Sequence, residues 1–211
     1  MLVSHEKKFI YLKCGKTAST STEAFLQAHC GDSELRLNVT QVSTRGIISH
    51  PFRPLPGTLF HAHMPARELK PVLGERVWSD YFKFANVRNP FDAVVSAYFD
   101  QKAYYPGNPS FEEWWRRWSA YDFIWSVIEI DDCLAVDGIV RYENLFDDLD
   151  RICRRLDIGF DRASFPRERA QERPAVGGLK IPYQEVIPSV EIAEEIAHVF
   201  ARTLGEFGYR Y

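Results

Sequence analysis

Short runs of hydrophobic residues along the chain predict strands that alternate with amphipathic helices. β-Branched and aromatic residues predict strands at residues 8–12, 58–63, 81–87 and 138–142. Apolar residues spaced three to four positions apart predict helices at residues 23–28, 65–73, 92–101, 110–130, 145–156 and 189–204. Because strands that alternate with helices usually pair in parallel, we predict a single α/β domain over residues 1–211, with a central parallel sheet flanked by helices.

Composition and charge narrow the class of protein. The chain has 211 residues, of which 45% are hydrophobic and 26% are charged, as in soluble globular proteins. It has no apolar run of membrane-spanning length and no signal-peptide pattern, so we expect a cytoplasmic protein without a membrane partner. The net charge of −3 lacks the basic excess of a nucleic-acid-binding protein. The four cysteines are scattered without metal-ligand spacing, so no metal site is expected.

A small polar loop follows the first expected strand. It contains Gly15 and Lys16, then five hydroxyl residues within the next six positions, and leads into a helix. A strand, a polar loop and a helix together aim backbone N–H groups at an anion, to which Lys16 adds positive charge. The alternative is that the hydroxyl groups merely cap the helix. A Walker A loop needs a glycine five residues before Gly15, where the chain has Ile10, so an ATP or GTP loop is disfavoured.

Residues 9–21 resemble the first motif of the sulfotransferase family, in which a strand runs into P-K-T-G-G-T-S. The chain keeps the motif at Lys16, Thr17, Thr20 and Ser21. Small residues replace the usual proline and glycines at Gly15, Ala18 and Ser19. In the family this loop wraps the 5′-phosphosulfate of 3′-phosphoadenosine 5′-phosphosulfate (PAPS). The resemblance therefore implies a P-loop NTPase-like sulfotransferase fold, and a phosphosulfate site formed by Lys16, Thr17, Ala18, Ser19, Thr20 and Ser21.

A second motif lies at residues 84–98, which look like the family's strand–R-N-P-x-x-R–x-x–S-x-Y signature. Arg88 follows the expected strand, and Ser96 comes eight residues later. The family uses these two positions to bind the 3′-phosphate of the nucleotide, and an arginine fork suits phosphate oxygens. Ala93 replaces an arginine common in the family. The rival interpretation makes Arg88 a surface ion-pair partner and Ser96 an ordinary helix residue.

Weaker similarities follow downstream. Residues 140–145 are similar to the family's R-Y-E-D-L segment, and residues 207–209 to its F-G-Y ending. Residues 177–183 occupy the place of a basic loop that folds over the nucleotide. Lys180 is the candidate for that contact.

The chemistry needs a cation for the leaving phosphate and a base for the acceptor. Lys16 is the candidate cation. His61 and His63 form an H-x-H that resembles the histidine segment of uronyl 2-O-sulfotransferases, while residues 63–65 resemble the family's G-H-x-P form. On a strand the two rings would share one face. We take His63 as the first candidate base and His61 as the second. The alternatives are a structural pair, or a two-histidine metal site for which no third ligand is evident.

The expected function is transfer of a sulfuryl group from PAPS to a hydroxyl or amine of a small-molecule or glycan acceptor, without a metal. Two alternatives stay open, namely a P-loop kinase or NTPase and a non-catalytic nucleotide-binding module. The aromatic segment at residues 111–125 could form a wall for the acceptor, although aromatic residues at this helical spacing more often form core.

Overall fold

The computed structural model describes the chain apart from residues 31–39, 52–55, 58, 169–173 and 177–178. The chain folds into two compact units. The first unit combines Met1–Val87 with Ser126–Glu168, and the second combines Arg88–Trp125 with Arg169–Tyr211. The single domain predicted over residues 1–211 stays a prediction.

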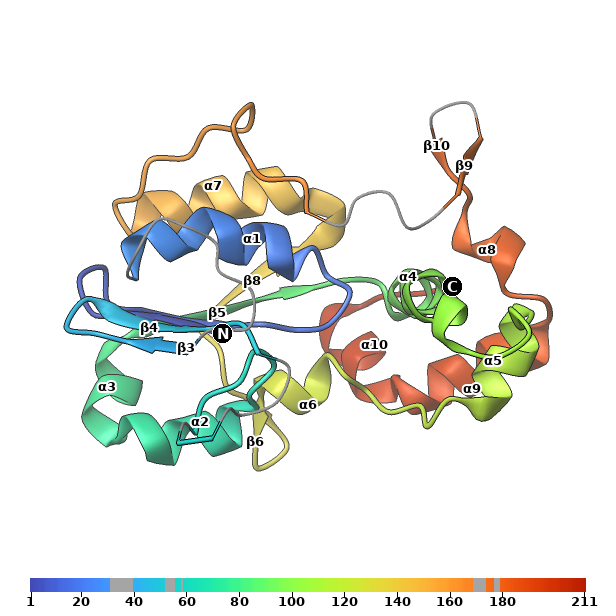
Figure 1. The fold of residues 1–211 in the computed structure, drawn as a ribbon, viewed down its shortest axis with the longest axis horizontal. Coiled ribbons are helices and arrows are strands. Elements are labelled where there is room, and N and C mark those ends of the chain that lie inside the picture. The colour runs from blue at the N-terminus through green and yellow to red at the C-terminus, as the bar shows by residue number, and fades with distance from the viewer. Residues whose placement is uncertain (31–39, 52–55, 58, 169–173, 177–178) are drawn as a thin grey trace. The chain divides into compact units, whose positions relative to one another are not determined.

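A mixed sheet forms the centre of the first unit. Its described residues make six strands in the order β3-β4-β1-β2-β5-β8 (Figure 1). The bounds are Leu2–Ser4 for β1, Phe9–Leu12 for β2, Thr40–Val42 for β3, Gly46–Ser49 for β4, Phe82–Val87 for β5 and Gly138–Arg141 for β8. β2, β5 and β8 pair in parallel, which confirms the prediction for that half of the sheet. The other half is antiparallel, because β1 forms a hairpin with β2 and then pairs with β4.

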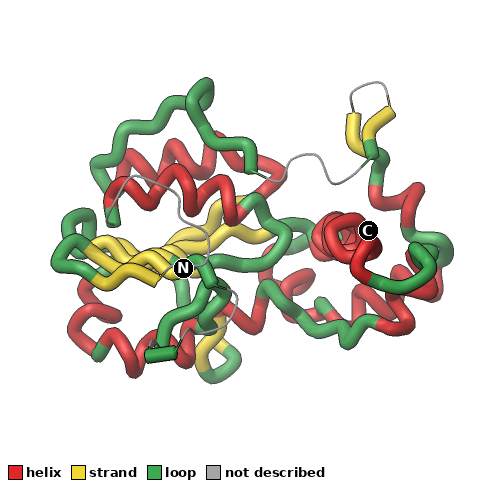
Figure 2. The backbone as a smooth tube through the Cα atoms, in the orientation of Figure 1, coloured by secondary structure: helices red, strands yellow, loops and turns green. Residues whose placement is uncertain are grey.

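Helices cover both faces of this sheet. α1 (Ser19–Leu26) and α7 (Leu145–Arg155) lie on one face, and α2 (Ala66–Leu73) and α3 (Glu75–Asp80) lie on the other. Figure 2 shows the strands in yellow between these two red layers. The remaining elements of the unit are short, namely η1 (Gln27–His29), η3 (Tyr142–Asn144), β6 (Glu129–Ile130) and β7 (Cys133–Leu134). Residues from the sheet, α1 and α7 share one hydrophobic core, which includes Phe9, Tyr11, Phe84, Val140, Leu149 and Ile152.

Gly138 in β8 is a position where the core leaves no room for a side chain. A Cβ atom there would lie 2.7 Å from Phe82 Cζ and 2.9 Å from Ile152 Cδ1. We therefore expect Gly138→Ala to lower the free energy of unfolding by about 1–3 kcal/mol, since overpacking displaces neighbouring side chains. Chemical denaturation measures the loss. Gly159→Ala is the control, because no described atom lies within 4 Å of its Cβ position. Equal losses in the two variants would contradict the packing explanation.

The second unit is mainly helical. Its elements are α4 (Pro90–Gln101), η2 (Lys102–Tyr104), α5 (Phe111–Arg117), β9 (Ala175–Val176), β10 (Leu179–Lys180), α8 (Tyr183–Val186), α9 (Val190–Val199) and α10 (Ala201–Phe207). α6 (Trp125–Ile128) starts at the end of its first segment. Trp114 is fully buried, and its ring stacks on Trp118 with centroids 4.7 Å apart. Phe123 packs edge-on against Phe200 at 5.2 Å. The aromatic segment therefore forms core, and the wall for an acceptor is not supported.

Three expected elements differ from the structure. The strand predicted at residues 58–63 is wrong over its described part, since residues 59–63 form coil and a turn. The helix predicted at 110–130 is instead two short helices, α5 and α6, with an irregular segment between them. The last predicted helix divides into α9 and α10 at Phe200, whose backbone leaves helical geometry at φ −102° and ψ 22°. The spacing of hydrophobic residues identified which side of these helices is apolar, but it did not show where the helices are interrupted.

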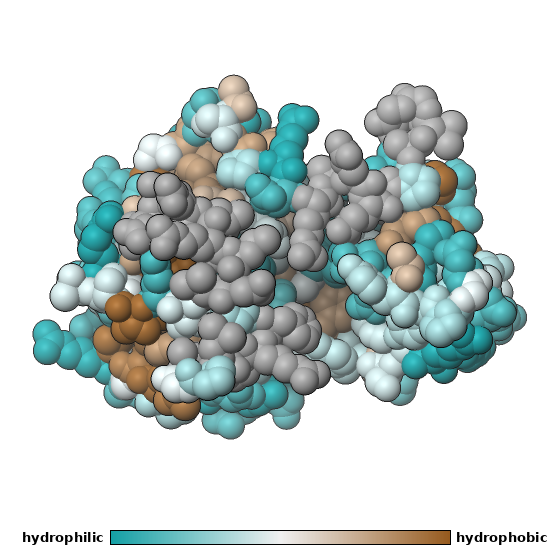
Figure 3. Space-filling view, in the orientation of Figure 1, coloured by the Kyte–Doolittle hydropathy of each residue, from teal (hydrophilic) through white to brown (hydrophobic). Residues whose placement is uncertain are grey.

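Hydrophilic residues cover much of the face drawn in Figure 3, and hydrophobic ones gather at its lower left. None of the described helices combines the length and the apolar character that a bilayer crossing requires. The cytoplasmic location stays a prediction.

Candidate functional site

The loop between β2 and α1 has an unusual backbone. Lys16 and Ala18 both adopt the left-handed conformation, with φ of 58° and 60°. Residues other than glycine rarely do so, and such strain tends to occur at ligand-binding sites. The sulfotransferase motif has glycine at the position of Ala18, which agrees with this backbone. The loop therefore keeps a glycine-type shape although it carries alanine.

The helix after the loop presents N–H groups at its start. α1 begins at Ser19 after its N-cap residue Ala18, whose side chain makes no cap hydrogen bond. The first N–H groups of a helix have no partner within the helix, and the helix dipole makes this end attractive to anions. The interpretation of the hydroxyl groups as simple helix caps is therefore not supported. Lys16 and Thr20, which are close to this helix end in the sequence, are both half-buried.

Two of the loop's hydroxyl groups hold the loop itself. Thr17 Oγ1 and Ser19 Oγ both donate to the carbonyl oxygen of Cys14, at 3.1 and 2.6 Å. Their protons are therefore engaged within the protein, and we expect these residues to offer backbone N–H groups to a ligand. The Ser21 hydroxyl accepts a hydrogen bond from the Glu168 backbone N–H at 3.0 Å. It retains its own proton for donation.

Asn86 is a site residue that the sequence reasoning missed. It is fully buried in β5, and its Nδ2 donates to the Thr17 carbonyl at 3.1 Å and to Thr22 Oγ1 at 2.8 Å. Asn86 thereby fixes both the loop and the first turns of α1. The available signal was a polar amide inside a strand predicted to be buried, because a buried amide needs specific hydrogen-bond partners.

Arg88 follows β5 directly and opens the second unit. Its side chain is 4% exposed, and both Nε and one terminal nitrogen contact Asp92 Oδ2, at 2.7 and 2.6 Å. The ion pair of the rival interpretation is thus present, but it is buried and not on the surface. Asn89 accepts a hydrogen bond from the Phe91 N–H and Pro90 begins α4, so the motif also starts the helix. Ser96 lies half-buried on α4.

His63 lies against the start of the loop. Its Nδ1 is 2.7 Å from the carbonyl oxygen of Lys13, 50 positions earlier in the chain. Because a carbonyl oxygen only accepts, Nδ1 carries the proton and Nε2 carries the lone pair of the neutral ring. Burial, with the nearby Lys13 ammonium, lowers the pKa of His63 to about 4. His63 is therefore neutral at pH 7 and can accept a proton at Nε2.

His61 is less well oriented. Its Nε2 lies 3.8 Å from Glu68 Oε2, and its buried Nδ1 has no hydrogen-bond partner among the described residues. Burial lowers the pKa of His61 too, against the opposing effect of Glu68. Ala62 between the two histidines is buried, whereas His61 and His63 are each half-buried, and the segment is not a strand. Over the described part of the chain, no three His, Cys, Asp or Glu side chains are grouped to hold a metal ion.

Lys180 lies on a small hairpin of the second unit. It is exposed in β10, where it pairs with Ala175 of β9. Its exposure leaves the ammonium accessible. Its role in closing over a nucleotide stays a prediction.

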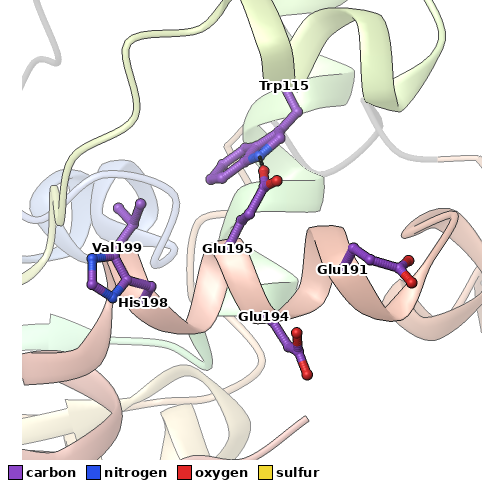
Figure 4. Close-up of a pocket in the computed structure, with 6 residues that line it drawn as sticks. All are labelled: Trp115, Glu191, Glu194, Glu195, His198 and Val199. Carbon is purple, nitrogen blue, oxygen red and sulfur yellow. Dashed lines mark hydrogen bonds between the residues drawn. The ribbon is translucent and has the colours of Figure 1, made fainter.

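A hollow of about 540 Å³ in the second unit is a different kind of site. It is lined by Trp115, Glu191, Glu194, Glu195, His198 and Val199. Figure 4 shows the Trp115 ring beside Glu195, to which its Nε1 donates at 2.8 Å. Three carboxylates would repel a nucleotide phosphate, and none of the predicted site residues lines this hollow. It is therefore not the candidate donor site.

Comparison with known proteins agrees with the geometry around β2 and β5. The sequence model of a family described as the sulfotransferase family matches residues 1–175. The chain belongs to the sulfotransferase family. The resemblance based on residues 9–21 and 84–98 is thus confirmed, and this family's chemistry is sulfuryl transfer. No curated protein matches the chain. The matched range contains the loop, both histidines, Arg88 and Ser96, whereas Lys180 and the F-G-Y ending lie beyond it.

Proposed function

We propose that this sulfotransferase moves a sulfuryl group from PAPS to a hydroxyl or amine of a small-molecule or glycan acceptor, using a P-loop NTPase-like fold. The observation that carries the proposal is the loop after β2. Lys16 and Ala18 are left-handed there, the N-cap residue Ala18 offers no side-chain cap to α1, and His63 forms a hydrogen bond with Lys13. These features support an anion site with a neutral histidine beside it, the two groups that we assign to sulfuryl transfer.

We assign the 5′-phosphosulfate and the 3′-phosphate of the donor to residues that follow two different strands. Residues 16–21 are proposed to hold the 5′-phosphosulfate through N–H groups and the Lys16 ammonium. Arg88 and Ser96 are proposed to hold the 3′-phosphate, with Lys180 closing over the nucleotide. The loop follows β2 and Arg88 follows β5, the parallel neighbour of β2, and ligands commonly bind beyond the carboxyl ends of such strands. When bound, PAPS supplies the activated sulfuryl group.

Two side chains are proposed to assist the transfer. His63 accepts the proton of the acceptor hydroxyl or amine at Nε2, while Lys16 stabilises the negative charge that grows on the leaving phosphate oxygen. A pKa near 4 makes His63 a weak base in the free protein. Negative charge in the site favours the protonated ring, so His63 becomes a stronger base beside a bound anion.

Arg88→Ala is expected to weaken the binding of 3′,5′-adenosine bisphosphate about 10–100-fold, because a charge-assisted hydrogen bond contributes ~1.5–3 kcal/mol. Isothermal titration calorimetry measures the affinity. Arg154→Ala is the control, since Arg154 forms an exposed ion pair with Asp150 on α7. Removing Arg88 also uncovers the Asp92 carboxylate, so the double variant Arg88→Ala, Asp92→Ala separates lost attraction from new repulsion. Unchanged affinity in Arg88→Ala would refute the phosphate assignment.

The same titrations distinguish the alternative functions. Binding of ATP with Mg²⁺, without binding of the bisphosphate, would favour the P-loop kinase or NTPase. Bisphosphate binding without transfer from PAPS across pools of hydroxyl and amine acceptors would favour the non-catalytic module. Plain AMP serves as the control that lacks the 3′-phosphate.

A further inference from the structure

A buried carboxylate lies directly behind the loop. Glu23 on α1 has a side chain that is 1% exposed, and its Oε2 lies 2.5 Å from Lys13 Nζ. His50 Nδ1 lies 3.1 Å from the same oxygen, and the Met1 amino group lies 3.2 Å from Oε1. Despite burial, these neighbours hold the pKa of Glu23 well below its usual range. Glu23 is therefore a buried negative charge held by three positively charged or protonatable groups, Lys13, His50 and the Met1 amino group.

Lys13 connects this carboxylate to the candidate base. Its ammonium contacts Glu23, while its own backbone carbonyl accepts the hydrogen bond from His63 Nδ1. The Lys13 side chain is only 9% exposed, so the ion pair fixes it in the interior. The Met1 amino group also donates to the carbonyl of Ala62, at 2.7 Å, next to His63 in the chain. Two of the partners of Glu23, Lys13 and the Met1 amino group, thus contact His63 or its neighbour Ala62.

We propose that Glu23 is a positioning residue for His63: through Lys13, it keeps the His63 ring in the form with the proton on Nδ1. This inference rests on the proposed role of His63 as the base. Histidine in water prefers the proton on Nε2, which would block acceptance of a proton there. The Lys13 carbonyl reverses this preference because it accepts the Nδ1 proton. A hydrogen bond to one ring nitrogen of an active-site histidine commonly decides in this way which nitrogen is protonated.

The charged groups that face His63 are Lys13, Glu23 and the Met1 amino group. Lys13 and Met1 lower the pKa of His63, and Glu23 raises it. Neutralising Glu23 also leaves the Lys13 ammonium buried without its counter-charge. Because these effects oppose one another, the pKa of His63 is a poor test of positioning. The proton's location on the ring is the direct test.

The test is ¹⁵N NMR of the His63 ring in the whole chain at neutral pH, with His63→Gln to assign the signals. In the unaltered protein we expect the shifts of a protonated Nδ1 and an unprotonated Nε2. Glu23→Gln and Lys13→Met should both increase the share of the form protonated on Nε2. His50→Gln is the matched control, because it removes a partner of Glu23 but leaves the Lys13 contacts.

Turnover provides the second readout. In both variants we expect kcat to fall about 10–100-fold with unchanged affinity for 3′,5′-adenosine bisphosphate, by analogy with the loss on removing a residue that orients a metal-ligating histidine. If Glu23→Gln fails to fold, Lys13→Met tests the proposal instead. In that variant the Glu23 carboxylate keeps His50 and the Met1 amino group as partners, so we expect the protein to fold. Ring shifts like those of the unaltered protein in a folded Lys13→Met would overturn the proposal. Altered ring shifts without loss of turnover would support the positioning and refute His63 as the base.

Discussion

His63→Ala is expected to lower kcat for sulfuryl transfer about 10²–10⁴-fold, the range usual for loss of a general base. The affinity for 3′,5′-adenosine bisphosphate should stay unchanged, because His63 is proposed to act on the acceptor. His63 is the histidine whose partner leaves Nε2 as the proton acceptor. Single-turnover transfer from PAPS, measured beside calorimetric binding, separates the two quantities.

His61→Ala shows which of the two histidines acts. We expect a smaller loss of kcat, since none of the described residues fixes the ring through its Nδ1. His198→Ala on the exposed side of α9 is the control and should keep full turnover. Full activity in His63→Ala, or a larger loss in His61→Ala, would remove His63 as the base. A parallel loss of bisphosphate affinity would show instead that the loop had been disturbed.

Glu23→Ala is expected to lower the free energy of unfolding by about 3–5 kcal/mol, because it leaves the Lys13 ammonium buried without its partner. For a chain of this size the change corresponds to a Tm about 6–20 °C lower. Circular dichroism during heating and in urea measures both. Asp150→Ala is the matched control, since it breaks an ion pair in which Arg154 is 79% exposed. That variant should change stability by less than about 0.5 kcal/mol.

A double variant separates charge from packing at Glu23. Lys13→Met with Glu23→Leu removes both charges while keeping apolar volume, and should recover at least half of the lost stability. A loss below about 1 kcal/mol in Glu23→Ala would mean that Lys13 reaches water once released. In that case the ion pair would not hold the loop, and the positioning of His63 would need another explanation.

The sequence by itself determined the elements whose causes are local. Asn89 and Pro90 start α4 through a cap and a preset backbone angle that involve residues only one or two positions apart. The alternating residues of β5 and the amphipathic residues of α7 likewise defined these elements, because periodicity repeats within a few residues. The two family motifs are local for the same reason, so the loop, Arg88 and the sulfotransferase family were predictable.

Only the tertiary structure decided which distant groups meet. β1 was not predicted, since a three-residue strand has no periodicity of its own and exists through pairing with β2 and β4. Nothing in the sequence links His63 to Lys13, 50 positions earlier, or Asn86 to Thr17, 69 positions earlier. Buried polar groups need partners wherever the chain brings them. Those partners depend on strand order, which local patterns do not encode. The sequence could therefore rank His63 above His61, but only the structure shows the hydrogen bond to Lys13 that orients the His63 ring.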